Sequence, residues 1–290
     1  MKQLTKEQRV AVIRCFVEGC SIRSTVRITG VAKNTIQKLT VDLGEACMTY
    51  QDETLRNLNC KRIECDEIWN LCYAKDKNLP DSMRGQPGVG SMWTWTAICA
   101  ESKLIVSWLL GSRDAECGTV FMRDVASRLA NRVQLTSDGL KSYLSAVDAA
   151  FAGDVDFSVL VKTYGKSPEA PESRYSPAIC TGCKKEKVVG NPDPAFVSTS
   201  YVERQNLNIR MQNRRFTRLT NAFSKKAAML EYSLAITFFY HNFVRVHQTL
   251  KMTPAMKAGV AMKKWGIEDM IDLIPELAYN TRPKKTSQGQ

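Results

Sequence analysis

The 290-residue sequence has only two histidines and no apolar run long enough to span a membrane. A spanning helix needs about 20 consecutive apolar residues, whereas residues 92–100 and 104–110 form short runs separated by Lys103. The N-terminus lacks the apolar core of a signal peptide, so we expect mature sequence and no membrane partner. With 44% hydrophobic and 8% aromatic residues, the composition is that of a folded globular chain.

Ten cysteines are scattered through apolar segments without a signal peptide. We therefore expect reduced thiols in the cytoplasm rather than a disulfide framework. Cys180 and Cys183 form a single Cys-x-x-Cys with no histidine nearby, which is half of a tetrahedral zinc site. A second half would have to come from distant or partner cysteines, so zinc is disfavoured there and ordinary loop thiols are expected.

Acidic residues are scarce in the last third of the chain, and the net charge is +12. Between Arg204 and Lys264 there are 12 basic residues and a single acid, Glu231, and residues 1–50 carry 8 basic residues against 4 acidic ones. Residues 51–200 are nearly neutral, with 18 basic and 19 acidic residues. Clustered Lys and Arg favour a nucleic acid as the partner over the alternative, a merely soluble basic surface.

Residues 1–50 have the pattern of a helix-turn-helix domain. A capping box of Thr5 and Gln8 begins a first helix, Ser21 caps a second, and a turn at Gly30 and Val31 precedes a third. The helix after such a turn presents its first residues to the DNA major groove. The alternative is a small helical protein-binding module. The candidate DNA contacts are Lys33, Asn34, Gln37 and Lys38.

The rest of the sequence predicts an α/β domain over residues 58–265, after a polar linker at 49–57. Its mixed five-stranded sheet, with flanking helices, comprises strands at 63–73, 92–100, 104–110, 133–136 and 157–161, with helices at 114–131 and 143–151. Residues 162–200 are rich in Pro, Gly and Lys and are expected to be an insertion or long loop. Helices are then expected at 201–219, 223–243 and 255–265, followed by a disordered tail at 280–290.

Three acids stand out by position. Asp66 lies inside an apolar strand, Asp138 ends a strand before Gly139, and Glu203 lies in the first turn of a helix. An acid buried in a central strand requires a cation or a hydrogen-bond partner. A set made only of carboxylates favours Mg²⁺ or Mn²⁺, and two such ions can act on both sides of a phosphodiester.

Basic side chains follow the third acid. Arg204, Arg210, Arg214 and Arg215 are predicted on the helix of Glu203, where they can contact phosphate or form a solvated basic face. His247 has two equally weighted interpretations, as a contact to phosphate or metal-bound water and as a residue that caps or packs the adjoining helix.

Four sequence stretches together resemble one family. They are CDEIWN around Asp66, TSDG around Asp138, SYVERQNLNIRMQNRR around Glu203, and YHNFVRVHQTLKMTPAMKAG at 240–259. This order closely resembles the DDE transposases of bacterial insertion sequences, specifically the insertion sequence 1 family, from the helix-turn-helix to about residue 259. The chain departs from that family's best-known members in having no zinc-binding segment before the helix-turn-helix.

The resemblance implies a ribonuclease-H-like catalytic domain in which Asp66, Asp138 and Glu203 hold two divalent ions. It implies cleavage of transposon ends and transfer of the 3′ hydroxyls to target DNA by a homodimer or higher homo-oligomer, associated with the nucleoid of a prokaryotic cytoplasm. Two alternatives stay open. The chain could be a helix-turn-helix regulator with a degenerate catalytic domain, or a structure-selective nuclease on the same fold.

Overall fold

The structure, a computed structural model, describes residues 4–165 and 180–275. The tail predicted at 280–290 lies outside these residues. The helices are α1 (Lys6–Val17), α2 (Ile22–Thr29), α3 (Lys33–Thr54), α4 (Ala115–Arg128), α5 (Ser142–Phe151), α6 (Ser200–Gln212), α7 (Ala227–Phe239), α8 (Pro254–Lys257) and α9 (Ile267–Asp272). The strands are β1 (Arg62–Cys72), β2 (Gly90–Cys99), β3 (Ile105–Gly111), β4 (Gln134–Ser137), β5 (Asp156–Tyr164) and β6 (Cys180–Val189). In this part of the chain, no helix is long and apolar enough to cross a membrane.

The first three helices begin at the residues that the sequence predicts. The Thr5 hydroxyl accepts a hydrogen bond from the Gln8 backbone N–H at 3.3 Å, and the Gln8 side chain accepts one from the Thr5 N–H at 3.1 Å. The Ser21 hydroxyl caps α2 by accepting a hydrogen bond from the Ser24 N–H at 3.0 Å, and Gly30 ends the helix with a φ of 69°. That backbone conformation favours glycine because a side chain would clash there. The predicted helices and caps are therefore confirmed.

Helix α3 is longer than expected. The linker predicted at 49–57 is wrong over its first six residues, because α3 continues to Thr54. The polar Gln51 is buried where α3 packs on α7, and its side-chain amide donates to the carbonyls of Cys47 at 3.0 Å and Ala235 at 3.3 Å. Polar residues at 49–54 therefore did not indicate a loop, because a polar side chain such as Gln51 can be buried in a helix when it is hydrogen-bonded.

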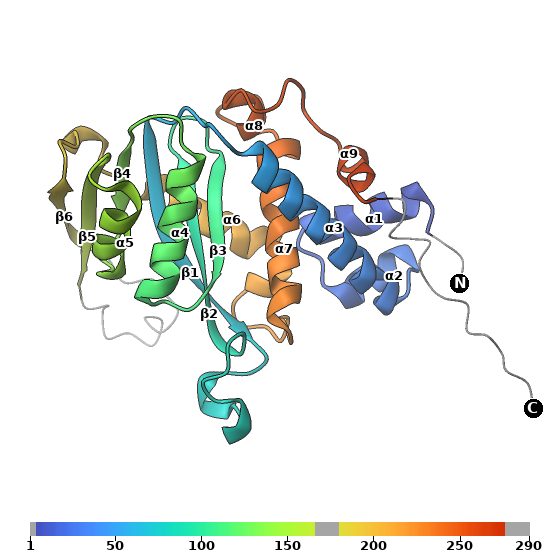
Figure 1. The fold of residues 1–290 in the computed structure, drawn as a ribbon. Coiled ribbons are helices and arrows are strands. Elements are labelled where there is room, and N and C mark those ends of the chain that lie inside the picture. The colour runs from blue at the N-terminus through green and yellow to red at the C-terminus, as the bar shows by residue number, and fades with distance from the viewer. Residues whose placement is uncertain (1–3, 166–179, 276–290) are drawn as a thin grey trace, which may run out of the picture.

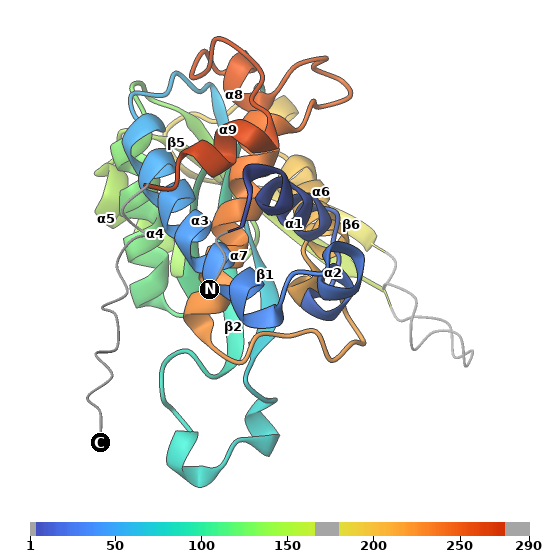
Figure 2. The same cartoon turned by 90° about the vertical axis from the view of Figure 1, so that its right-hand side faces the viewer.

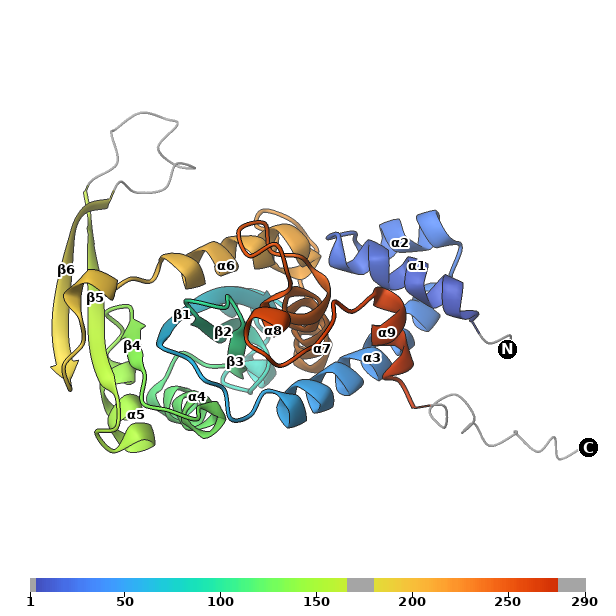
Figure 3. The ribbon, with the colours of Figure 1, turned by 90° about the horizontal axis from the view of Figure 1, so that it is seen from above.

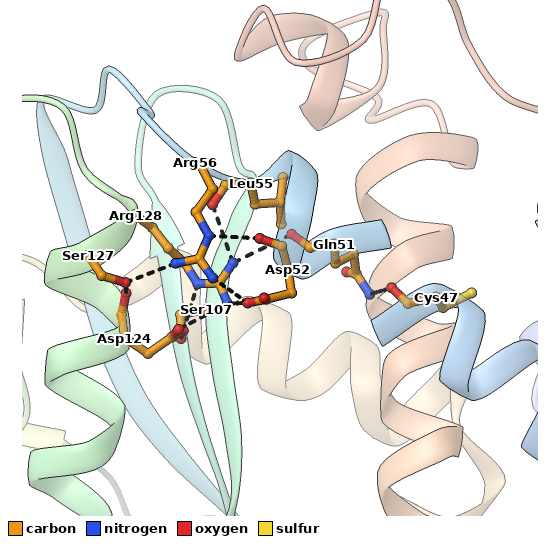
Figure 4. A network of polar contacts seen from close by, with 9 residues as sticks. All are labelled: Cys47, Gln51, Asp52, Leu55, Arg56, Ser107, Asp124, Ser127 and Arg128. Atoms are coloured by element: carbon orange, nitrogen blue, oxygen red, sulfur yellow. Dashed lines mark hydrogen bonds and ion pairs between the residues drawn. The ribbon is translucent and has the colours of Figure 1, made fainter. Parts of the chain in front are cut away.

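The C-terminal end of α3 is fastened to α4 mainly by Arg128, and Arg56 adds a bond to the Ser127 hydroxyl of α4 at 3.0 Å (Figure 4). Arg128 donates to the backbone carbonyls of Gln51 and Leu55 and to the carboxylates of Asp52 at 2.8 Å and Asp124 at 2.6 Å. A cation at the end of a helix also interacts favourably with the helix dipole. This network holds the C-terminal end of α3 against α4.

The sheet has the order β3-β2-β1-β4-β5-β6. Strands β1 to β3 are antiparallel neighbours, β4 is parallel to β1, and β5 is parallel to β4. The predicted α/β class with a mixed sheet is confirmed, but the sheet has six strands instead of five. The extra strand, β6, pairs antiparallel with β5 inside the segment 162–200 that was expected to be a loop.

Strand β6 was missed because it has no apolar alternation. Its side chains are almost all exposed, and its backbone pairs with only one neighbour at the end of the sheet. Edge strands commonly carry lysines, which discourage pairing with other chains. Since periodicity detects only strands that bury a face, it did not detect this one.

Helices cover both faces of the sheet (Figure 3). Helices α4 and α5 lie on one face, where Trp95, Phe121 and Tyr143 are fully buried. Helices α6 and α7 lie on the other face, where Ile68 of β1 joins an apolar cluster with Phe238 of α7. Alternate residues of β1 therefore point to different helical layers, as the pleat of a strand requires.

The later helices are shorter than predicted. Helix α6 ends at Gln212 because the buried side chain of Asn213 bonds to the hydroxyls of Ser233 at 2.6 Å and Thr237 at 3.1 Å. The helix expected at 255–265 has only four residues, and Gly259 follows it with a φ of 74°. Helix α9, beyond the predicted end of the domain at 265, packs against α1 (Figure 2).

Candidate metal centre

Two of the three predicted acids meet where β4 ends. In the parallel pair of β1 and β4, Cys65 is opposite Ser137, so Asp66 and Asp138 are the next residues on each strand. Asp138 leaves the sheet here, and its carboxylate is fixed by the backbone N–H of Leu140 at 3.0 Å. The pairing of β1 with β4 ends at Cys65 and Ser137, and the Asp138 carboxylate lies next to the acids that follow Cys65 on β1.

Glu67 is a third carboxylate in this group, and the sequence did not identify it. One carboxylate oxygen from each of Asp66, Glu67 and Asp138 lies within 4.8 Å of the other two, and the group can hold a metal ion. Strand alternation assigns Glu67 to the opposite face from Asp66. Because β4 ends at Ser137, Asp138 reaches past the edge to both neighbours. The only sequence signal for Glu67 was its position directly after Asp66.

The group has more negative charge than its surroundings neutralise. Burial, reinforced by Asp138 and Glu203, raises the pKa of Asp66 to about 7. Burial and Asp138 likewise raise the pKa of Glu67 to about 7. The buried Tyr143 hydroxyl faces the Glu67 carboxyl and lowers its pKa, but it does not offset the effect of burial and of Asp138. These features match a site completed by a cation, since carboxylate oxygens are the ligands that Mg²⁺ and Mn²⁺ prefer.

One arginine partly neutralises the group. Arg113 donates from Nε to Glu67 at 3.1 Å, and its terminal nitrogen lies 3.5 Å from an oxygen of Asp138. The same guanidinium lies 4.6 Å from the centre of the Trp93 ring. The aromatic contact holds the cation at the edge of the acidic group.

Glu203, the third predicted acid, lies close to the group without belonging to it. Its Oε1 atom accepts hydrogen bonds from the Lys162 ammonium and, at 2.5 Å, from the Thr199 hydroxyl. One turn along α6, the side-chain amide of Asn206 donates to Asp66 at 2.8 Å. The face of α6 that carries Glu203 is therefore directed at Asp66, and their charges interact.

A buried glutamate sets the position of α6. Glu64, only 3% exposed, accepts hydrogen bonds from the backbone N–H groups of Tyr201 at 2.7 Å and Val202 at 3.1 Å. The first N–H groups of a helix have no partner within the helix, and they favour a negative charge. Glu64 thus fastens the start of α6 to β1, two residues from Asp66, and brings Glu203 to the acidic group.

The predicted DNA contacts on α3 lie on its outer face. Lys33, Asn34 and Lys38 are exposed and Gln37 is partly exposed, while Ile36 is buried. Lys38 also forms an ion pair of 2.7 Å with an acid one turn along the helix. The four side chains are at least partly exposed at the start of α3, and their role in contacting DNA stays a prediction.

The arginines after Glu203 do not share one helix. Arg204 is exposed on α6 and Arg210 is half-buried on it, with a pKa lowered to about 10 by burial and by Arg218. Arg214 and Arg215 were expected on the same helix, but they lie in the 3-10 turn Arg214–Phe216 after α6. The buried Asn213 that ends α6 is the physical reason.

Arg215 has internal partners. It donates from Nε to the Ser224 hydroxyl at 2.9 Å, and its guanidinium lies 5.5 Å from the ring centre of Phe16 in α1. Burial lowers its pKa to about 10. These contacts join the N-terminal helices to the α/β domain, so Arg215 has a packing role beside the DNA contact predicted for it.

His247 lies apart from the acidic group. Its backbone N–H donates to Met252 at 3.0 Å, and burial together with Lys103 and Arg245 lowers the pKa of its ring. The group of possible metal ligands found in the described residues contains neither histidine nor Cys180 and Cys183. Both interpretations of His247 therefore stay predictions.

Comparison with known proteins adds no family. No model of a known protein family matches the chain, and no curated protein is detectably similar to it. Function must therefore be inferred from the sequence pattern and from the site itself.

Proposed function

We propose that this chain is a metal-dependent DNA transposase that cleaves transposon ends and transfers the 3′ hydroxyls to target DNA. The observation that carries the proposal is the group of Asp66 and Glu67 on β1 and Asp138 just after β4, each with a carboxylate oxygen within 4.8 Å of the others. The sequence around Asp66, Asp138 and Glu203 resembles that of DDE transposases, and this resemblance is the reason for proposing DNA as the substrate.

In this proposal Asp66, Asp138 and Glu203 hold two Mg²⁺ or Mn²⁺ ions. Ions bound there would supply the charge that activates a hydroxyl nucleophile and stabilises the leaving oxygen. Glu203 would exchange its hydrogen bond from Lys162 for the metal. Glu64 and Asn206 position the acids by fixing α6 on β1 and by orienting Asp66.

The charge distribution supports DNA as the substrate. The exposed residues at the start of α3 and the basic segment after Glu203 provide two regions suited to phosphate. Transposon ends and target are both double-stranded DNA, and pairing two ends requires a homodimer or larger assembly. Such an enzyme would act at the nucleoid in a prokaryotic cytoplasm.

The decisive test is end cleavage and joining by purified protein with Mg²⁺, DNA carrying the terminal inverted repeats of the element, and a target plasmid. We expect Asp66→Asn, Asp138→Asn and Glu203→Gln each to lower both rates by a factor on the order of 10² to 10³ or more, because each removes charge stabilisation of several kcal/mol. DNA binding should be retained. Glu53→Gln, at an exposed position of α3, is the matched control and should be unchanged.

Other outcomes would select the alternatives. A shift of the DNA with no cleavage would indicate the regulator, and cleavage with no joined product would indicate the nuclease. Titration with Mn²⁺ tests the site separately from activity: Asp66→Asn should weaken binding at least tenfold, and Glu53→Gln should not. Full cleavage by any of the three variants would refute the ligand assignment. Glu67→Gln in the same titration shows whether Glu67 is also a ligand.

A further inference from the structure

Two thiols lie side by side on the outermost strand of the sheet. Cys180 and Cys183 of β6 are both exposed, and their sulfur atoms are 3.7 Å apart. Five other cysteines are fully buried and three are partly buried. The exposed pair is therefore the one that a dissolved reagent reaches most readily.

A β-bulge brings these thiols together. Residues three apart on a regular strand point to opposite faces. Here Cys183 is opposite Lys162 and Gly182 is opposite Thr163, but Cys180 is opposite Tyr164, which leaves Thr181 as an extra residue. Because of this extra residue, the side chains of Cys180 and Cys183 lie on the same side of β6.

Basic residues surround the two thiols. The strand carries several lysines, and the residue opposite Cys183 is Lys162, which donates to Glu203. Reactive thiols are typically exposed and surrounded by positive charge, because the thiolate is the nucleophile. The hydrogen bond with Cys180 raises the pKa of Cys183, and Lys162 only partly opposes this effect. The exposure of the two thiols and their separation of 3.7 Å are therefore what favour a reaction between them. The lysines on β6 are Lys184, Lys185 and Lys187.

We propose that Cys180 and Cys183 are a reversible oxidation site, which hydrogen peroxide converts into an intramolecular disulfide. One thiolate attacks the peroxide oxygen, the O–O bond breaks, and a sulfenic acid and one water form. The second thiol then displaces the sulfenic oxygen as water, so that two thiols lose two electrons and two protons and the peroxide becomes two waters. The sulfurs must approach from 3.7 Å to about 2.05 Å, which an edge strand with one neighbour can accommodate.

This proposal does not depend on the proposed function and is tested on the thiols themselves. The purified full chain is treated with hydrogen peroxide, the remaining thiols are alkylated, and the protein is analysed by intact mass and peptide mapping. We expect loss of two alkylatable thiols and a disulfide confined to Cys180 and Cys183, and we expect a dithiol reductant to restore both. Cys117→Ser, at a partly buried cysteine, should react as the parent does.

Single variants separate this site from other thiol chemistry. Cys183→Ser and Cys180→Ser should each abolish the internal disulfide and leave the other thiol as a sulfenic acid or an intermolecular disulfide. The proposal is overturned if peroxide couples a different pair, such as Cys15 and Cys20, while these two stay alkylatable. It is equally overturned if bound zinc protects both thiols from peroxide in the protein as purified.

Discussion

At the scale of single residues, burial determines which acidic side chains have shifted pKa values. Asp66 and Glu67 have pKa values raised to about 7, because both are removed from water and face Asp138. Glu64 is buried as well, but it accepts two backbone N–H bonds at the start of α6. Adjacent acids of one strand thus have different tasks, since one anchors a helix and the others form a possible metal site.

His241 provides a prediction about pH. It is fully enclosed in the π-helical turn Tyr240–Val244, with its Nε2 atom 2.9 Å from the carbonyl oxygen of Lys103. Burial lowers its pKa from 6.5 to about 4, so the folded protein keeps the ring neutral. Below pH 6.5 the unfolded chain binds a proton that the folded chain excludes. The free energy of unfolding should therefore fall by about 3 kcal/mol between pH 6.5 and pH 4 on account of this residue.

Denaturant unfolding of the parent protein and of His241→Gln over this pH range tests the prediction. The variant should lose that part of the acid destabilisation, while His247→Gln, at a less buried ring, should keep it. Parallel stability curves for the parent and His241→Gln would show that the buried ring is not the cause.

At the scale of elements, α3 connects the N-terminal helices α1 and α2 to α4 and the sheet. It begins with the exposed residues predicted to contact DNA and ends at the Arg128 network (Figure 4). Between these points it packs on α7 through buried positions that include Gly44 and Cys47. A single helix thus connects the predicted DNA-contacting surface to the sheet.

Arg128→Met should loosen this link. The Arg128 side chain is 10% exposed, and it bonds to Asp52, Asp124 and two carbonyls of α3. Removing the cation should lower the free energy of unfolding by about 2–4 kcal/mol, because the acids and carbonyls lose a shared partner. Arg56→Met is the comparison because Arg56 is more exposed, although it too pairs with Asp52 and donates to the Ser127 hydroxyl of α4. It should cost about 1 kcal/mol or less, and equal losses for both variants in urea unfolding would contradict the argument.

Gly44 marks a close approach of α3 to α7. A Cβ atom at this position would lie 2.5 Å from the Cβ atom of Tyr232 and 2.9 Å from its Cα. Alanine normally stabilises the middle of a helix by about 1 kcal/mol over glycine, but here the helices would have to separate. Gly44→Ala should therefore destabilise the protein by about 1–3 kcal/mol in thermal or urea unfolding.

Gly118 of α4 is the matched position. A Cβ atom there would meet its nearest neighbour, Trp95, at 3.5 Å, an ordinary contact. Gly118→Ala should be neutral or stabilising. A similar result for Gly44→Ala would mean that α3 and α7 are less closely packed than described.

At the scale of the whole molecule, the net charge of +12 is divided between regions that the fold separates. Arg204 is exposed on α6, on the side of the sheet that Glu203 occupies, whereas Arg123 is exposed on α4 across the sheet (Figure 3). If DNA lies over the acidic group, only the first of these should contact phosphate.

Binding of inverted-repeat DNA at several salt concentrations tests this arrangement. Arg204→Gln should weaken binding to all sequences and reduce the slope of log K against log salt by about 0.9, the value for one lost phosphate contact. Arg123→Gln should leave the slope unchanged. Equal effects of the two variants would indicate diffuse attraction by net charge rather than a defined DNA path.

Much of the fold follows from local pattern. Capping residues located α1 and α2, and period-two alternation located β1 with Asp66 on it. The elements that were missed depend on partners distant in sequence. The last turns of α3 are stabilised by α7 and Arg128, and α6 is ended by a side chain that bonds to α7.

The sequence by itself determined the α/β class, the helical caps, and the placement of Asp66 on a strand and of Asp138 at the end of one, because these depend on periodicity and on neighbours along the chain. Tertiary structure alone decided that Glu67 joins those acids, that Glu203 bonds to Lys162, and that Cys180 lies beside Cys183. Glu67 joins the acids because β4 ends at Ser137. Glu203 is brought to Lys162 because Glu64 holds the start of α6, and the two cysteines meet because β6 contains a bulge. Distances between strands and helices are set by packing, and packing is a property of the whole chain.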